Sequence, residues 1–252
     1  MVFTRELKMD PLRVLRWCRQ VSWIFALVVS LVAASAQMQP APAQSAEELA
    51  RILSRMDQTA ANFHTTQATF VWDQYQKVVD ETDTQKGTVY FRRSGNEVQM
   101  AADISDPAPP KYVLFTDSKV EVYQPKIDQV TRYNTGKERS AFEGFLVLGF
   151  GGSGKDMLKS FDVSYIGTEK VDGVDTAKLE LVPKSPKVRN TFDHIKLWID
   201  PARGVSVQQQ LFEPSGDYRL AKYSDIQLNQ KIPEDRFKLK TTSKTKVVSP
   251  QG

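Results

Sequence analysis

The sequence of 252 residues contains a single cysteine, Cys18. It precedes an apolar run from Val21 to Val32, and residues 37–252 contain no cysteine. Disulfides, thiolate nucleophiles and cysteine-ligated metals are therefore excluded from this part of the chain. A bacterial lipoprotein carries its lipid-modified cysteine directly after such a run, so the sequence does not indicate lipidation by that route.

Histidine is also scarce, and the two that are present, His64 and His194, lie far apart. Two isolated histidines without a cysteine do not make a zinc site, and the sequence has no His-Glu-x-x-His motif. It also lacks a Gly-x-Ser-x-Gly nucleophile motif and carboxylates paired by their spacing. We therefore expect no metal, no cofactor and no enzymatic activity.

One segment, Gly149–Asp156, nearly matches the phosphate-binding motif Gly-x-x-x-x-Gly-Lys-Ser/Thr. The motif needs a hydroxyl group that binds Mg²⁺ at its last position, and Asp156 stands there instead. Its carboxylate would repel the phosphates of a nucleotide. We interpret the segment as a flexible turn, a hinge for a lid, rather than as a nucleotide site.

No block of like charge runs through the sequence. The whole chain has a formal net charge of +4 at pH 7. Residues 1–36 contain five basic and two acidic residues, a charge of +3, which leaves +1 for residues 37–252. Binding to nucleic acid through phosphate contacts therefore has little support, and we expect no nucleic-acid partner.

The first 36 residues are typical of a targeting segment. Arg13, Arg16 and Arg19 form a positive region before the apolar run, and Ala34-Ser35-Ala36 gives the small-x-small pattern of a cleavage site. The run is shorter than the about 20 residues that a membrane-spanning helix needs. We expect a signal peptide over residues 1–36, export to the periplasm, and cleavage after Ala36 or, as the alternative, after Ala43. An uncleaved anchor helix is the competing interpretation.

The remaining chain reads as a tether, a helix and a series of strands. Residues 37–44, rich in Gln, Pro and Ala, predict a disordered tether. Ser45 and Glu48 form a capping box that starts a helix, and an apolar stripe at helical spacing continues it to Phe63. From Thr65 the apolar period becomes two, which predicts short strands joined by turns. The predicted strands cover residues 65–73, 88–93, 98–104, 112–116, 119–123, 129–133, 162–167, 174–183, 192–200, 205–213 and 218–228, with a last strand at 237–239 and a short helix over 155–161.

These elements predict a mainly β fold with helices (α+β). A single antiparallel sheet of about eleven strands tends to curl, so we expect a strongly curved sheet that forms an incomplete β-barrel with helices over one end. If the sheet curls without closing, its concave face is an apolar cavity. Composition alone does not distinguish a lined cavity from a filled core.

Four segments, in this order, resemble one family. They are Glu47–Phe63 with the strand that follows, Gly87–Gly95, Asp117–Pro125, and a group formed by Leu179–Lys184, Trp198–Asp200 and Ile232–Phe237. In these segments, from about Glu47 to Val248, the sequence resembles the LolA-like family of periplasmic outer-membrane lipoprotein carriers. Ser94 stands where the family has proline, and Ser243-Lys244-Thr245 where it often has Pro-Lys-Gly. The chain is thus divergent, and its cargo is open.

The resemblance implies a carrier domain over residues 45–252, with helices as a lid over an apolar cavity. It implies a monomer that binds the acyl chains of lipoproteins, receives them from an inner-membrane release complex and passes them to an outer-membrane receptor. Arg93 matches the arginine that helps to control the family's lid, although it also suits an ordinary exposed strand end. The expected cavity residues are Leu53, Phe70, Trp72, Val89, Phe91, Val98, Met100, Val122, Phe145, Leu148, Leu181 and Trp198.

Other functions remain open on the same fold. A regulatory module that senses lipid or mislocalised lipoprotein is the alternative, and an added domain would favour it. An outer-membrane receptor of the related kind would need a lipid-modified cysteine after the apolar run. A secreted hydrolase would need a catalytic constellation. The sequence provides neither feature.

Overall fold

The computed structural model of the chain describes residues 42–95, 97–116, 119–134 and 148–249. These residues belong to one compact unit, residues 40–252. The predicted signal peptide and the first part of the predicted tether lie outside the described residues. None of the helices in the described ranges is both long enough and apolar enough to cross a membrane.

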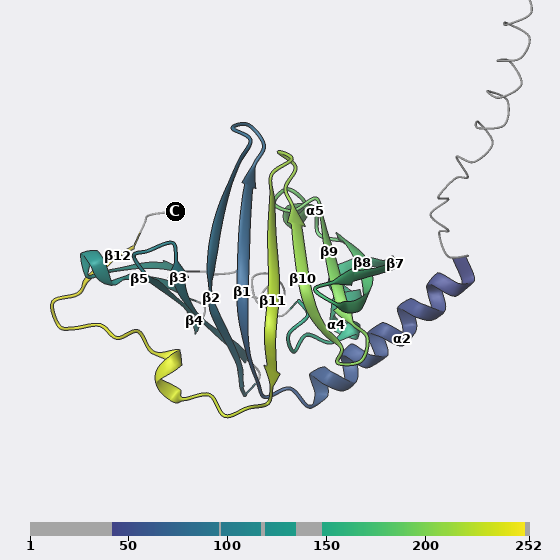
Figure 1. Cartoon of the computed structure of the whole chain (residues 1–252), viewed down its shortest axis with the longest axis horizontal. Helices are drawn as coiled ribbons and strands as arrows, with labels where there is room; N and C mark the ends of the chain where they lie inside the picture. Colours follow the sequence, from purple (N-terminus) through teal and green to yellow (C-terminus); the bar gives the residue numbers. More distant parts are fainter. Residues whose placement is uncertain (1–41, 96, 117–118, 135–147, 250–252) are drawn as a thin grey trace, which may run out of the picture. The chain divides into compact units, whose positions relative to one another are not determined.

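Twelve strands form one sheet in the described part of the chain (Figure 1). The order across the sheet is β12-β6-β5-β4-β3-β2-β1-β11-β10-β9-β8-β7. Every neighbouring pair is antiparallel except β12 with β6. The strands are β1 Thr65–Gln76, β2 Glu81–Ser94, β3 Glu97–Asp106, β4 Lys111–Thr116, β5 Lys119–Gln124, β6 Gln129–Asn134, β7 Phe161–Val171, β8 Val174–Pro183, β9 His194–Asp200, β10 Val205–Phe212, β11 Tyr218–Leu228 and β12 Lys246–Val248. Because β7 and β12 do not pair with each other, the sheet stays open, which confirms the predicted incomplete barrel.

The eleven strands predicted between residues 65 and 228 are all present. The alternation of apolar residues with a period of two, together with the residues typical of turns, was sufficient to locate these strands in the sequence. The strand predicted at 237–239 is wrong, because a 3-10 turn occupies Glu234–Phe237. The last strand is instead β12, which pairs with β6 in parallel.

The first helix begins earlier than the sequence predicts. Helix α2 covers Pro42–Ala61, so residues 42–44 belong to it rather than to a tether. Proline suits the first position of a helix, where no N–H is needed for the helical ladder. The capping box is therefore wrong: Ser45 lies inside the helix, and Glu48 forms an ion pair with Arg51 at 2.6 Å. The shorter helices are α4 Gly154–Ser160 and α5 Pro186–Arg189, and a further 3-10 turn covers Pro125–Ile127.

One face of the sheet is apolar across most of its width. Residues paired across neighbouring strands share a face, and Phe70 of β1 pairs with Tyr223 of β11, while Leu181 of β8 pairs with Ile195 of β9. We call this the inner face, because α2 packs against it. Figure 1 shows α2 and α4 beside strands β7 to β10. The buried residues that join α2 to these strands are Ile52, Leu53, Met56, Ala177, Leu179, Leu181, Ile195, Leu197 and Ile199.

The opposite, outer face is covered over β2 to β5 by the segment that follows β11. Figure 1 shows this segment, in yellow, running from the end of β11 to β12. Phe237 of the segment is buried in a cluster with Tyr90, Ala101 and Leu114 of the sheet. The salt bridge between Arg236 and Asp103, at 2.8 Å, fastens the same segment. The apolar residues near Phe237 are therefore spaced as in a strand, but they pack on the face of the sheet and do not pair with another strand.

Candidate functional site

The predicted cavity residues gather on the inner face. Ten of them lie on this face or on the elements packed against it: Leu53, Phe70, Trp72, Val89, Phe91, Val98, Met100, Val122, Leu148 and Leu181. They divide into two clusters, one under α2 over β7–β10 and one over β1–β4. Val122 extends the face to β5, where it pairs with Val113. Phe145 lies outside the described residues.

Trp198 is the exception, and the structure corrects its assignment. In β9 the inner positions belong to Leu197 and Ile199, both fully buried in the cluster under α2. Because side chains alternate along a strand, Trp198 points to the outer face. It packs there with Val171 and Val207, and the Lys178 ammonium lies 4.7 Å from its ring. Trp198 therefore does not belong to the candidate site.

Residues 148–153, which we call the plug segment, lie over the middle of the inner face. Phe150 is its central side chain and has no exposed surface. Its ring stacks on Phe91 of β2 with centroids 5.3 Å apart, and it meets Tyr223 of β11 edge-on at 4.8 Å. Burial also raises the pKa of the Tyr223 hydroxyl above its ordinary value. The plug segment thus fills space between β2 and β11 that would otherwise be open.

Hydrogen bonds from β10 hold the plug segment in place. Gln209, a buried polar residue of β10, donates from its side-chain amide to the Leu148 carbonyl. The Ser206 N–H donates to the Gly149 carbonyl at 3.0 Å. Gly151 has a φ of +81°, and a Cβ at this position would lie 2.5 Å from the Phe63 ring. A side chain at position 151 would therefore force the plug segment away from the end of α2.

Arg93 joins three elements at one end of the inner face. It stands at the end of β2, paired with Val98 of β3. Its guanidinium donates to the Gly151 carbonyl of the plug segment at 3.1 Å and to the Ala60 carbonyl of α2 at 3.5 Å. It also lies 5.7 Å from the centre of the Phe63 ring. Arg93 is thus placed to hold both covering elements against the sheet.

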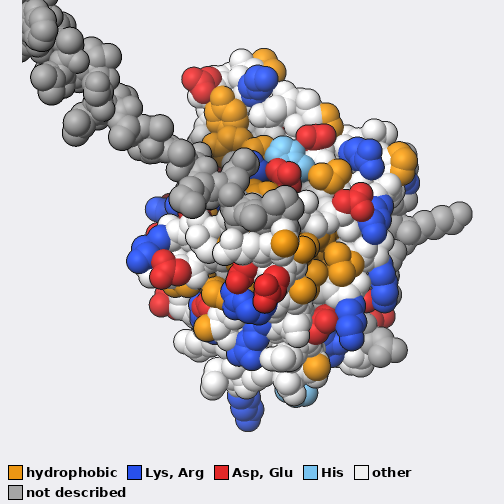
Figure 2. Space-filling model, turned by 90° about the vertical axis from the view of Figure 1, so that its right-hand side faces the viewer, with side chains coloured by type: hydrophobic (Ala, Val, Ile, Leu, Met, Phe, Trp, Pro, Cys, Tyr) orange, Lys and Arg blue, Asp and Glu red, His pale blue; other side chains and the backbone are white. Residues whose placement is uncertain are grey.

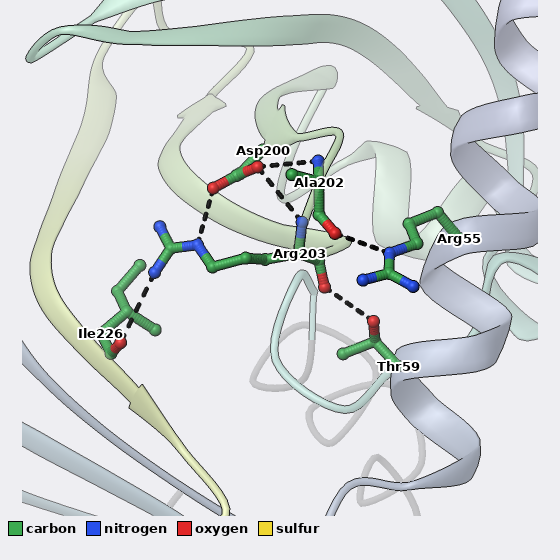
Figure 3. A network of polar contacts seen from close by, with 6 residues as sticks. All are labelled: Arg55, Thr59, Asp200, Ala202, Arg203 and Ile226. Carbon is green, nitrogen blue, oxygen red and sulfur yellow. Dashed lines mark hydrogen bonds and ion pairs between the residues drawn. The ribbon is translucent and has the colours of Figure 1, made fainter.

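The turn between β9 and β10, residues 200–204, holds the middle of α2 (Figure 3). Arg55 donates from Nε to the Ala202 carbonyl, and Thr59 donates from its hydroxyl to the Arg203 carbonyl, each at 2.7 Å. The Asp200 carboxylate shapes the turn, since it accepts from the Ala202 N–H at 2.8 Å and from Arg203 Nε at 2.6 Å. We call this group the latch turn.

The latch turn depends on an ionised Asp200. Burial raises the pKa of the Asp200 carboxyl, but the Arg203 guanidinium and the N–H groups of Ala202 and Arg203 outweigh burial and hold this pKa below its ordinary value. The carboxylate therefore stays charged at neutral pH, and the turn keeps its hydrogen bonds. The sequence predicted Asp200 only as the end of a strand and indicated no role for Asp200, Gln209 or Thr59.

The other motifs have structural roles. Ser153 caps α4, with its hydroxyl accepting from the Asp156 N–H at 3.0 Å, and the Asp156 carboxylate accepts from Ser153 at 2.7 Å. In the segment that resembles a phosphate loop, the Asp156 carboxylate thus takes part in capping the helix. Among the described residues no group of histidines and acids is arranged to hold a metal ion. Figure 2 shows the side that lies at the right of Figure 1, where charges of both signs are interspersed with hydrophobic side chains.

Comparison with known proteins gives distant matches. A family model described as an uncharacterized protein matches residues 113–234. An uncharacterized protein of Methanocaldococcus jannaschii is 28% identical over 95 residues, which cover 38% of this chain and 26% of that relative. The chain therefore spans about a quarter of the length of this curated relative.

Solved structures match over most of the described unit. An uncharacterized conserved protein from Thermus thermophilus is 13% identical with a TM-score of 0.51, covering 81% of this chain and 99% of that chain. A LolA superfamily protein from Nitrosomonas europaea is 16% identical with a TM-score of 0.37, covering 77% of this chain and 97% of that chain. Identities this low concern the fold alone. The chain thus shares its overall fold with the Thermus thermophilus protein. The LolA-like fold stays a prediction from the resemblance of the sequence.

Proposed function

We propose that this protein carries the lipid anchor of another protein on the inner face of its sheet. The observation that supports the proposal is a continuous apolar face, from β5 to β8, that α2, α4 and the plug segment cover among the described residues. Polar contacts from Arg93, Gln209 and the latch turn fasten these covering elements. A face covered in this way can open for a ligand without breaking the sheet.

The energetics require such a shielded face. Transfer of an acyl chain of about 15 methylenes from water yields about 0.8 kcal/mol per methylene, roughly 10 kcal/mol for each chain. An anchor released into water without a carrier would lose this free energy. Phe150 would have to leave its place between Phe91 and Tyr223 to admit an acyl chain.

The cellular setting completes the proposal. The protein is a periplasmic, non-catalytic monomer that follows a cleaved signal peptide over residues 1–36. It receives a lipoprotein from an inner-membrane release complex and transfers it to an outer-membrane receptor.

A displacement experiment tests lipid-anchor binding. An environment-sensitive apolar dye is bound to the purified protein, and a triacylated cysteine peptide is titrated in, with the unacylated peptide as the control. We expect only the acylated peptide to displace the dye. If no dye binds, or if both peptides act alike, the inner face is a filled core and the proposal fails.

Replacing Arg93 with Leu is expected to leave cargo binding intact and to impair release. The variant loses the hydrogen bonds to Gly151 and Ala60, while the added apolar side chain remains beside Val98 on the inner face. The equilibrium between the state in which α2 and the plug segment cover the inner face and the state in which they are displaced then differs from that of the wild type. The measurement is transfer of an acylated peptide to acceptor vesicles. Unchanged transfer would exclude a role for Arg93 in the lid.

A further inference from the structure

One buried hydroxyl group of the inner face makes no hydrogen bond within the part of the chain that the structure describes. It belongs to Thr66 of β1, a residue with no exposed surface. Thr66 pairs across the sheet with Phe91 of β2 and with Leu228 of β11. A hydroxyl group that is buried without a partner destabilises a folded protein, because it has given up its hydrogen bonds to water.

The surroundings of this hydroxyl are apolar. Since Phe91 lies on the inner face, its cross-strand neighbour Thr66 points to the same face, as does Ala68 two residues further along β1. The Phe91 ring in turn stacks on Phe150 of the plug segment, with centroids 5.3 Å apart. Thr66 therefore belongs to the apolar surface on which the plug segment packs.

Packing alone does not require a hydroxyl at this position. Valine has nearly the same shape, suits a strand equally well and would carry no unpaired group. Thr176 of β8 shows how a buried threonine is ordinarily satisfied, because it is 1% exposed and its hydroxyl donates to the Glu169 carbonyl at 2.5 Å. The Thr66 hydroxyl is thus a donor that the protein itself does not use.

A diacylglyceryl group offers the matching acceptor. The polar groups joined directly to its acyl chains are ester carbonyls, which accept hydrogen bonds and donate none. In an apolar cavity such a carbonyl needs a donor, for the same reason that a buried hydroxyl needs a partner. An ester suits one hydroxyl better than an amide does, since the N–H of an amide would need an acceptor as well.

We propose that the Thr66 hydroxyl donates a hydrogen bond to an ester carbonyl of a diacylglyceryl group bound on the inner face. The contact forms once Phe150 leaves Phe91, the neighbour of Thr66. This inference rests on the proposed function and adds a selectivity to it, because acyl chains joined through esters bind more tightly than alkyl chains of equal length. Lipoprotein anchors and phospholipids share this group, and the test separates the two sources.

The test compares ester and ether ligands by displacement of the apolar dye. The ligands are a diacylglyceryl cysteine peptide and its dialkyl ether analogue, and a second arm uses a short-chain diacyl phospholipid and its ether analogue. We expect the wild type to bind the ester peptide about three- to tenfold more tightly than the ether peptide, and Thr66→Val to remove this difference. An ester preference that persists in Thr66→Val, or that the wild type lacks, would overturn the inference.

Stability gives an independent readout. Thr66→Val removes an unpaired polar group, so the midpoint of urea unfolding should rise. Thr176→Val is the matched control, because it removes a hydroxyl that is buried but paired, and its midpoint should fall by about 0.5 M. Ala177 lies on the inner face, so Thr176 points to the outer face and its variant should keep the ester preference. An equal fall in Thr66→Val would show that its hydroxyl has a partner in the folded protein, and the inference would fail.

Failure of this inference can be told from failure of the proposed function. If the ester peptide displaces the dye and Thr66→Val leaves the ratio of ester to ether affinity unchanged, only this inference fails. If the ester preference appears with the phospholipid alone, the proposed function fails and the ester contact stands. If no ligand displaces the dye, both fail.

Discussion

Replacing Phe150 with Ala is expected to lower the free energy of unfolding by about 3–5 kcal/mol and, in the same variant, to increase binding of an apolar dye. The side chain is fully buried between Phe91 and Tyr223, so its removal costs both transfer free energy and packing. The space that it leaves faces the apolar residues of β1–β3. If acyl chains bind there, the wild-type protein must displace Phe150, and the variant has already lost it.

The matched control is Phe237→Ala. Phe237 is equally a buried phenylalanine, 5% exposed, but it lies on the outer face in the segment that follows β11. We expect a comparable loss of stability, measured by urea unfolding, without any gain in dye binding. A gain of the same size in both variants would mean that the dye reports on general loosening. No gain in Phe150→Ala would argue that the inner face is a permanent core.

The alternation of apolar residues located the strands well, because side chains in a half-buried sheet obey a period of two. It failed where apolar residues are buried without pairing. The spacing of Phe237 and Leu239 resembles a strand, yet both residues pack on the outer face from a segment that crosses the sheet. Local pattern shows that a residue is buried but not which partner buries it.

The candidate site was predictable in composition but not in geometry. Large apolar residues such as Phe70 and Trp72 could be assigned to one face from the sequence, since they recur at every second position of a predicted strand. Trp198 was misassigned because size alone does not define which face of a strand a residue occupies. The contacts of Gln209 and Asp200 join segments far apart in the chain, and no single sequence reveals such pairs. Likewise, the sequence could not show that the pairing of β10 with β11 ends at Gln208 and Lys222, because the strand register was not known.

Replacing Asp200 with Ala is expected to lower the free energy of unfolding by about 2–3 kcal/mol and to increase hydrogen exchange in α2. The carboxylate accepts from two N–H groups of its own turn and pairs with Arg203, and hydrogen bonds to charged groups contribute about 1.5–3 kcal/mol. Arg203 itself is 39% exposed and remains solvated, so the loss stays below that of a fully buried ion pair. Without the turn, Arg55 and Thr59 of α2 lose their acceptors.

Glu121→Ala provides the comparison, because Glu121 pairs with Arg132 at 2.8 Å and the arginine has the same exposed fraction, 39%. Among the described residues, the Glu121 carboxylate accepts no N–H group of a turn, and we expect the loss of this cross-strand ion pair to cost at most about 1 kcal/mol.

The pH dependence of stability is a second check on the role of Asp200. The pKa of Asp200 is lowered in the folded protein, so its contribution is complete above the ordinary value of 3.8 and is lost as the pH falls through the folded-state value. The difference in stability between wild type and Asp200→Ala should therefore be constant from pH 5 to 7 and shrink below about pH 4. A difference that already shrinks between pH 7 and 5, or an unchanged exchange rate in α2, would show that Asp200 does not hold the helix through the latch turn.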